Sequence, residues 1–212
     1  MRKIGLLSDT HGYWDDKYLK YFADCDEIWH AGDIGSDELA ARLASIHPLR
    51  AVYGNIDGQN LRLEYPKIAH FQVEQVRVMM THIGGYPGRY NPEIRKELFD
   101  TRPQLFIAGH SHILKVAFDP TLSCLYMNPG AAGKSGFHLK RTLLRFVIDG
   151  DKIKDLEVIE SLILFLLFRH FLFAITETFC KENRVLQIRK LTFKVNREDS
   201  FSQVFLNLLN GP

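Results

Sequence analysis

The chain has 212 residues, 46% of them hydrophobic and 25% charged, which suits one ordinary α/β domain with a buried core. The formal net charge of +2 comes from the end of the chain, because residues 1–160 carry 20 Lys and Arg against 21 Asp and Glu, whereas residues 161–212 carry 7 against 4. The main part therefore has no basic stripe of the kind that nucleic-acid-binding proteins usually show.

The first part of the chain alternates between expected strands and helices. Residues 4–8 form a short apolar run that ends in a polar turn, which is typical of a buried strand. Further strands are expected at residues 27–30 and 49–53. Helices are expected within residues 15–23 and from an N-cap at Ser36 through Ile46, with Pro48 ending the second helix. This alternation predicts a parallel sheet with functional residues at the carboxyl ends of its strands.

The pattern changes from Lys67 onward. Residues 68–73 and 76–81 flank Glu74-Gln75 and predict a hairpin, and a helix is expected within residues 92–99. Further strands are expected at residues 105–108, 116–119, 124–127, 142–148 and 152–158. The last two of these flank Asp149-Gly150, a strong hairpin turn. This count predicts two packed sheets with helices on the outside.

The composition shifts at Ser161, so we expect a domain over residues 1–160 and an atypical apolar extension over residues 161–212. The extension holds eight of the fifteen Phe and one Gly. Its apolar run at residues 162–175 is shorter than the roughly 20 residues of a membrane span and is interrupted by Arg169-His170. Core packing or a contact between protomers, and hence a homo-oligomer, is favoured over a membrane anchor.

The three cysteines predict no disulfide framework. Cys25, Cys124 and Cys180 form no C-x-x-C pair, and no secretory signal precedes the first strand. We therefore expect a cytoplasmic protein. Cys124 lies in an apolar stretch and is expected to be an inert, packed thiol.

Five short polar segments, each after an apolar run, carry oxygen or imidazole groups suited to metal ions. They are Asp9-Thr10-His11, Gly32-Asp33, Gly54-Asn55, Thr81-His82 and Gly109-His110-Ser111-His112. Each segment alone has a simpler interpretation, such as a helix cap, a turn residue or a histidine at the edge of the core. Asp9 and His11 alternate with Thr10, so both side chains are expected on one side of a strand end. Together the segments predict a two-metal phosphoesterase site in which Asp33 bridges the ions.

These segments, together with residues 7–12, 30–34 and 54–57, resemble the calcineurin-like metallophosphoesterases. The resemblance is closer to the small YfcE-type phosphodiesterases, whose eukaryotic relative is a retromer scaffold subunit. It covers residues 1–160 and implies a four-layer α-β-β-α sandwich of two mixed sheets. It assigns Asp9, His11, Asp33 and His112 to one ion and Asp33, Asn55, His82 and His110 to the other. It also implies catalytic roles for Asp33, Asn55, His82 and His110.

The mixed nitrogen and oxygen donors suit Mn²⁺, iron, Zn²⁺ or Ni²⁺ better than Ca²⁺ or Mg²⁺. We expect two such ions, with Mn²⁺ preferred, to activate a water molecule that attacks the phosphorus of a small phosphate ester. Many relatives carry His directly after the Gly-Asn pair, where it protonates the leaving oxygen. Here that position is Ile56. Because Ile56 cannot donate a proton, activated phosphodiesters are expected to be better substrates than alkyl phosphomonoesters. With the resemblance, this predicts a phosphodiesterase, with a phosphomonoesterase and a non-catalytic scaffold of the same fold as alternatives.

Four further features of the sequence have roles that are either open or expected to be structural. Asp57 either holds a ligand histidine in its tautomer or caps the turn. The glycine-rich stretch at residues 84–90, with Arg89, either contacts the substrate or is a surface connection. The turn at residues 128–130 is expected to shape the wall of the site. Four histidines have no ligand-like neighbours and are expected to be structural or exposed: His30, His47, His70 and His138.

Overall fold

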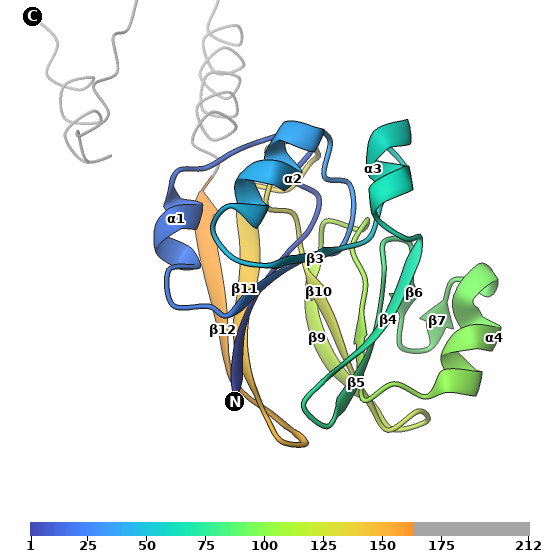
Figure 1. The fold of residues 1–212 in the computed structure, drawn as a ribbon. Coiled ribbons are helices and arrows are strands. Elements are labelled where there is room, and N and C mark those ends of the chain that lie inside the picture. The colour runs from blue at the N-terminus through green and yellow to red at the C-terminus, as the bar shows by residue number, and fades with distance from the viewer. Residues whose placement is uncertain (163–212) are drawn as a thin grey trace, which may run out of the picture. The chain divides into compact units, whose positions relative to one another are not determined.

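The computed structural model describes residues 1–162, which form two five-stranded sheets packed face to face (Figure 1). The first sheet has the order β12-β11-β1-β2-β3. Its three parallel strands β1, β2 and β3 continue through β11 and β12, which are antiparallel to their neighbours. The strands are β1 (Arg2–Leu7), β2 (Glu27–His30), β3 (Leu49–Ala51), β11 (Lys140–Asp149) and β12 (Lys152–Leu162).

The second sheet has the order β4-β5-β8-β10-β9. Strands β5, β8 and β10 run parallel in its centre, and β4 and β9 are antiparallel strands at its two edges. A small separate hairpin, β6 with β7, follows β5. The bounds are β4 (Ile68–Val73), β5 (Val76–Thr81), β6 (Gly85–Tyr86), β7 (Arg89–Tyr90), β8 (Leu105–Ile107), β9 (Leu114–Asp119) and β10 (Cys124–Pro129).

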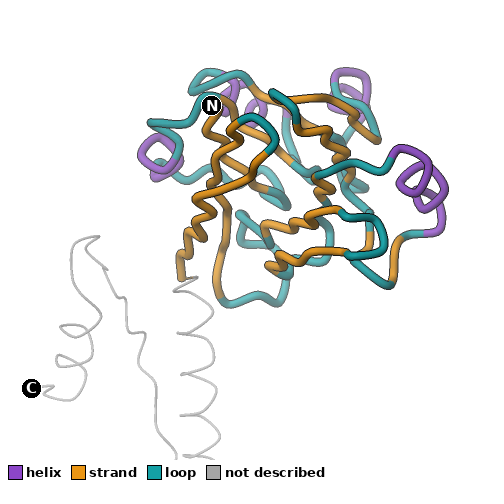
Figure 2. Tube along the Cα trace, turned by 90° about the horizontal axis from the view of Figure 1, so that it is seen from below, coloured by secondary structure: helices purple, strands orange, loops and turns teal. Residues whose placement is uncertain are grey.

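The helices lie on the outside of the two sheets (Figures 1 and 2). They are α1 (Lys17–Tyr21), α2 (Asp37–Ala44), α3 (Gln59–Glu64) and α4 (Pro92–Thr101). Helix α2 begins where the sequence predicts, because the Ser36 hydroxyl accepts a hydrogen bond from the backbone N–H of Leu39 at 3.2 Å. The predicted four-layer α-β-β-α sandwich is confirmed.

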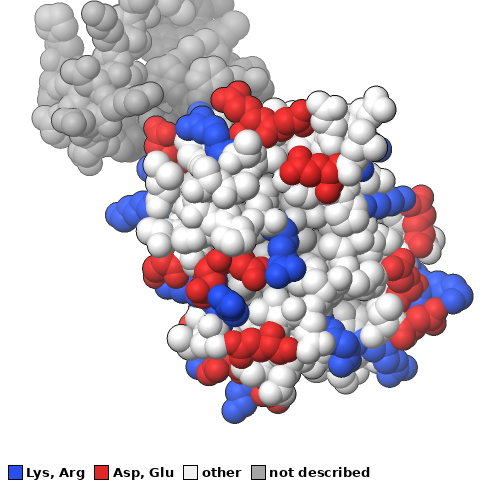
Figure 3. Space-filling view, viewed as in Figure 1, with Lys and Arg blue, Asp and Glu red and all other residues white. Residues whose placement is uncertain are grey.

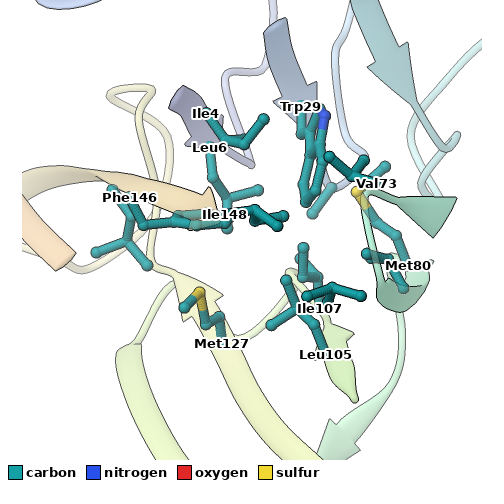
Figure 4. Close-up of a cluster of buried hydrophobic side chains, with 14 of the residues drawn as sticks. Ile4, Leu6, Trp29, Val73, Met80, Leu105, Ile107, Met127, Phe146 and Ile148 are labelled. Atoms are coloured by element: carbon teal, nitrogen blue, oxygen red, sulfur yellow. The ribbon is translucent and has the colours of Figure 1, made fainter. Parts of the chain in front are cut away.

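The main core lies between the two sheets, where side chains from β1, β2 and β11 face those from β5, β8 and β10 (Figure 4). Trp29 on β2 is fully buried there and packs edge to face against Phe71 at 4.9 Å and Phe146 at 5.7 Å between ring centroids. Burying one such large side chain stabilises the fold by roughly 1.5–3 kcal/mol. This packing holds the two sheets against each other, so the carboxyl ends of their parallel strands meet.

Most expected elements are present with shifted ends. The strand at residues 27–30 and the hairpin of β4 with β5 match the prediction, whereas β3 ends two residues early at Ala51. Helix α3 and the β6–β7 hairpin were not expected. Strand β12 continues to Leu162, two residues beyond the domain boundary that the composition predicts. The residues of the extension beyond that strand, including most of the apolar run and Cys180, lie outside the described residues, so the predictions for them stay predictions.

Both cysteines of the described part are buried free thiols. Burial raises the pKa of Cys25 to about 11 and that of Cys124 to about 12, so neither is a thiolate near neutral pH. The expectation of an inert thiol at Cys124 is confirmed. No helix within residues 1–162 is long and apolar enough to cross a membrane. On the face seen in Figure 3, acidic and basic side chains are interspersed, and neither forms a broad patch.

Candidate metal centre

The polar segments named from the sequence follow the carboxyl ends of strands in both sheets. Asp9 and His11 follow β1 and Asp33 follows β2 in the first sheet, whereas His82 follows β5 and His110 follows β8 in the second. The two sheets meet here directly, because the backbone N–H of His110 donates a hydrogen bond to Oδ2 of Asp9 at 3.1 Å. Face-to-face packing therefore assembles one site from segments about 100 residues apart.

A first group of potential ligands consists of Asp9, His11 and His112, with ligand atoms within 4.8 Å of one another. Nε2 of His112 lies 3.1 Å from Oδ1 of Asp9 and 3.3 Å from Nε2 of His11. Three potential donor atoms thus converge on one point. One carboxylate and two imidazoles suit a divalent transition metal.

A second group consists of Asp33, His82 and His110, again with ligand atoms within 4.8 Å of one another. Oδ1 of Asp33 lies 3.2 Å from Nε2 of His82, and the His82 and His110 rings are 5.2 Å apart. Oδ2 of Asp33 lies 3.8 Å from Nε2 of His11, which belongs to the first group. The two oxygens of one carboxylate therefore face two different groups.

Asn55 lies beside these groups on an exposed loop after β3. The next residue, Ile56, donates its backbone N–H to Oδ1 of Asp33 at 3.1 Å. A Cβ at Gly54 would lie 2.0 Å from the same oxygen, so only glycine permits this close approach. The loop with Asn55 is therefore fixed against the Asp33 carboxylate.

The backbone at the site is strained. Five of the candidate ligands have left-handed backbone conformations: Asp9 (φ 54°), His11 (φ 48°), Asp33 (φ 55°), His110 (φ 67°) and His112 (φ 58°). Such a conformation costs roughly 1–3 kcal/mol per residue and persists only where the surroundings enforce it. At Asp9, His11 and Asp33, hydrogen bonds between the β1 and β2 loops hold it, from Asp9 N to Gly32 O and from His11 N to Asp33 O, both at 3.0 Å.

This strain corrects one expectation about Asp9 and His11. The sequence suggested that they alternate along a strand end, but β1 ends at Leu7 and both residues lie in the turn that follows. Their side chains converge because of the left-handed backbone rather than because of strand pleating.

Two buried polar atoms at the site have no hydrogen-bond partner among the described residues: Oδ1 of Asp9 and Nε2 of His82. Nδ1 of His82 donates to the carbonyl oxygen of Ala31 at 2.8 Å, which leaves a lone pair on Nε2. Buried polar atoms without partners are rare in folded proteins. One metal ion in each group would give Oδ1 of Asp9 and Nε2 of His82 a partner. The residues present therefore fit two divalent ions.

Burial and neighbouring charged groups shift the pKa values of several side chains at the site. Burial alone would raise the pKa of Asp33, but His82 and the Ile56 N–H stabilise the carboxylate and lower it. Contact with the Asp9 carboxylate raises the pKa of His112. Burial lowers the pKa of His110, and the neighbouring His82 lowers it further. Without a metal ion, the two carboxylates thus favour protonated imidazoles in part of the site.

Asp57 ties the ligand loops together. Its Oδ1 accepts from the backbone N–H of Gly35 and its Oδ2 from that of Gly54, both at 2.7 Å. Of the two roles left open by the sequence, the structure thus shows the turn cap. The same contacts join the Asp33 loop to the Asn55 loop, a link between segments that the sequence alone does not reveal.

Arg62 supports the loop that carries Asn55, and Asn128 supports the loop that carries His110. Arg62 was not singled out in the sequence, since an arginine on a short helix gives no signal. Its guanidinium donates to the backbone oxygens of Asp57 at 2.7 Å and Asn55 at 2.9 Å. Asn128 Nδ2 donates to the carbonyl oxygen of Gly109 at 2.9 Å, so the turn at residues 128–130 does lie against the segment with His110 and His112.

The histidines expected to be structural or exposed have several environments. His30 is fully buried, and its Nε2 is 2.8 Å from the Thr10 hydroxyl. Burial lowers the pKa of His30 to about 4. His47 is half-buried, and His70 is exposed and pairs with Glu97.

His138 has a structural role, as the sequence predicts, but the sequence did not indicate its place beside a candidate ligand. Its ring packs edge to face on that of His112, with centroids 5.3 Å apart. Its Nε2 lies 3.0 Å from the carbonyl oxygen of Gly133, and the backbone N–H of Gly133 donates to the carbonyl oxygen of Asp9 at 3.0 Å. The loop after β10 therefore forms one wall beside the first group.

Two clefts of similar size lie near the second sheet, one of them between it and the loop after β3. One, of about 410 Å³, is lined by Arg89, Arg95 and Asp119, and none of the candidate ligands lines it. The other, of about 420 Å³, is lined by His82 and Asn55 and by Arg62. The glycine-rich hairpin thus carries Arg89 to the cleft away from the candidate ligands.

Known proteins resemble this chain in sequence. The family described as "Calcineurin-like phosphoesterase superfamily domain" matches residues 2–151. A "Probable metallophosphoesterase" of Methanothermobacter thermautotrophicus is 28% identical over 165 residues, which cover 74% of this chain and 92% of that protein. A second protein so named, from Methanocaldococcus jannaschii, is 27% identical over 136 residues, which cover 60% of this chain and 67% of that protein.

Solved structures share the fold. Vps29 of Chaetomium thermophilum has a TM-score of 0.60 at 14% identity, over 76% of this chain and 99% of that one. Vps29 of Entamoeba histolytica, solved with zinc, has a TM-score of 0.59 at 12% identity, over 75% and 98%. A predicted phosphoesterase of Streptococcus pneumoniae has a TM-score of 0.53 at 18% identity, over 74% and 88%. At these identities the resemblance concerns the fold alone.

Proposed function

This chain belongs to the calcineurin-like phosphoesterase superfamily, and we propose that it is a metal-dependent phosphodiesterase acting on a small phosphate ester. The observation that carries the proposal is the position of Asp33 between two groups of ligands. Its Oδ1 faces His82 at 3.2 Å and its Oδ2 faces His11 at 3.8 Å. One carboxylate between two such groups suits a pair of divalent ions a few ångströms apart.

In this proposal each group holds one ion. Asp9, His11 and His112 would hold the first, and Asp33, His82 and His110 would hold the second. Asn55, whose loop is fixed against Asp33, would complete the second set, and Asp33 would be shared. Two bound divalent ions lower the pKa of a water molecule and offset the charge on phosphoryl oxygens. Mn²⁺ is our first choice, although iron, Zn²⁺ and Ni²⁺ accept the same mixed carboxylate, amide and imidazole donors. A cytoplasmic setting is part of the same proposal.

The protein's own contribution is to hold these donors in place. The carbonyl oxygen of Ala31 fixes the tautomer of His82, so that Nε2 presents a lone pair. The Asp57 carboxylate holds the loops of Asp33 and Asn55 at a fixed separation. Donors held in this way need little rearrangement when charge develops on the substrate.

The choice of diesters over monoesters rests on the resemblance to the small YfcE-type phosphodiesterases, and position 56 agrees with it. Ile56 follows the Gly-Asn pair, is 47% exposed and carries no proton to donate. A leaving group must therefore depart without help from this position, which favours activated diesters over alkyl monoesters with poor leaving groups.

The test is a hydrolysis assay of the metal-free protein reconstituted with Mn²⁺, Fe²⁺, Zn²⁺ or Ni²⁺. Bis(p-nitrophenyl) phosphate and p-nitrophenyl phosphate share a leaving group and differ in esterification. We expect metal-dependent turnover with higher kcat/KM for the diester. A higher value for the monoester would make the protein a phosphomonoesterase. Absence of turnover with both metal sites filled would instead favour a scaffold.

A further inference from the structure

The cleft beside the second ligand group has the size and the charge of a substrate subsite. Its volume is about 420 Å³, within the range of small-molecule sites. Asn55 and His82 line it beside Tyr53, and its charged lining residues are Arg62, Lys67 and Glu93, two positive and one negative. A group attached to the phosphorus therefore has room to extend into this cleft.

Arg62 is fixed in the wall of the cleft. Nε donates to the carbonyl oxygen of Asp57 at 2.7 Å, and Nη2 donates to those of Asn55 at 2.9 Å and Gly54 at 3.3 Å. Its guanidinium also lies over the ring of Tyr53, 4.8 Å from the centroid. These contacts restrict the side chain before any ligand binds, which reduces the entropy lost on binding.

The charge of Arg62 is not balanced within residues 1–162. It forms no ion pair with a carboxylate of this part, in contrast to Arg50, which pairs with Glu27 at 2.6 Å. The hydrogen bonds of Arg62 use Nε and Nη2, and no acceptor among the described residues takes a hydrogen bond from Nη1. A guanidinium has five N–H donors, so two stay available to an acceptor.

Lys67 adds a second positive charge to the same cleft. It pairs with Glu93 at 2.9 Å, but these side chains are 58% and 67% exposed. Ion pairs at such exposure contribute roughly 0–1 kcal/mol, so Lys67 can exchange its partner at little cost. With Arg62 fixed and Lys67 exchangeable, the cleft suits an anionic group.

We propose that this cleft binds a second anionic group of the substrate, with Arg62 as its principal contact. The substrate class is then a phosphodiester whose organic part carries a further phosphate or carboxylate. This inference rests on the proposed phosphodiesterase function and adds to it the residue that selects among diesters. Charge-assisted hydrogen bonds of this kind change selectivity by roughly 10- to 100-fold.

Two matched substrates test the proposal: the p-nitrophenyl ester of thymidine 5′-phosphate, and the same compound with a phosphate on the 3′ oxygen. A third compound with a 3′-succinyl group separates a preference for phosphate from one for any anion. The Mn²⁺-loaded protein should favour both anionic compounds. Arg62→Met should reduce that preference by roughly 10- to 100-fold, and Arg62→Lys should reduce it less.

Arg95→Met is the matched control. Arg95 lies 5.5 Å from the centroid of the Phe99 ring and lines the other cleft, so its loss should leave the preference unchanged. An equal fall in kcat/KM for all three compounds in Arg62→Met would overturn the proposal, because Arg62 would then only support the Asn55 loop.

A binding measurement separates this inference from the proposed function. Calorimetric titration with thymidine 3′,5′-bisphosphate and with thymidine 5′-phosphate needs no turnover. The bisphosphate should bind more tightly to the wild-type protein, and Arg62→Met should remove that advantage. Equal affinities of the two compounds for the wild-type protein would refute the subsite even in an active enzyme, whereas a lost advantage in an inactive protein would support the subsite and refute only the hydrolysis.

Discussion

Asp33 and His82 approach each other to 3.2 Å, between Oδ1 and Nε2, yet the buried Nε2 has no hydrogen-bond partner among the described residues. The other ring nitrogen, Nδ1, donates a hydrogen bond to the carbonyl oxygen of Ala31. A carboxylate oxygen and an imidazole nitrogen with a free lone pair can bind the same metal ion when they lie at this distance. This pair is therefore the most direct structural sign of a metal ion.

Removing the charge of Asp33 should disable the metal centre. Asp33→Asn replaces the bridging carboxylate with a neutral amide, so metal content by elemental analysis should fall from two ions per chain. Hydrolysis should fall by roughly 100-fold or more, because even changes to residues behind the ligands cost 10- to 100-fold. Asp100→Asn is the control, since Asp100 is exposed and, within residues 1–162, pairs only with Lys96 on the same helix. Near-native turnover of a folded, metal-free Asp33→Asn would falsify the dinuclear site.

Asp57→Asn should weaken the fold and the second metal site together. The amide keeps one acceptor but turns an NH₂ group toward the N–H of Gly35 or Gly54, which leaves a buried donor without a partner. We expect a loss of about 1–3 kcal/mol in the free energy of unfolding, measured with urea on the metal-free protein. Calorimetric titration should show weaker binding of one ion. A variant as stable as the wild type would mean that the loops do not depend on this link.

Introducing a histidine at position 56 should supply the missing acid. In Ile56→His, kcat/KM for monoesters should rise relative to that for diesters, because an imidazole with a pKa near 6.5 can protonate a poor leaving group. Ile56→Gln controls for the added polarity, since it cannot titrate. The gain should appear in a comparison of phenyl and p-nitrophenyl leaving groups. Equal effects of His and Gln would exclude proton donation as the cause.

The stability of the metal-free protein should depend on His30 in mild acid. Its pKa falls from 6.5 to about 4 on folding because of burial, so between these values the unfolded chain binds the extra proton. The free energy of unfolding should therefore decrease as the pH falls from about 6.5 toward 4, by up to about 3 kcal/mol from this residue. His30→Gln should show a smaller decrease in urea unfolding at pH 7 and pH 5. The difference between the proteins isolates His30 from the site histidines, some of which titrate in the opposite sense.

The boundary of the catalytic domain can be tested by truncation. We expect a chain cut after Leu162 to fold, bind metal and hydrolyse diesters like the full-length protein. A cut after Glu160, the boundary that the composition suggests, should be less stable, because Ser161 accepts a hydrogen bond from the largely buried Arg141 at 3.0 Å. Thermal unfolding and metal content compare the two. A longer form that fails to fold would place residues 163–212 in the core.

Much of this protein follows from local sequence. The helix from Ser36 and the hairpin across Glu74 were predictable, because capping and turn residues act on the nearest few positions. The ligand segments were also visible, since short apolar runs followed by Asp or His place polar groups at strand ends. Likewise, Ile56 in place of a histidine can be read from one motif.

Only the tertiary structure shows the contacts between segments that are distant in sequence. The left-handed backbone at Asp9 and His11 depends on hydrogen bonds to the loop after β2, which no local pattern encodes. The position of His138 beside His112 and the hydrogen bond from Gly35 to Asp57 each join segments that are distant in sequence, through the packing of whole strands and helices. Sequence determines which groups are present, whereas the burial of two sheets against each other determines which of them meet.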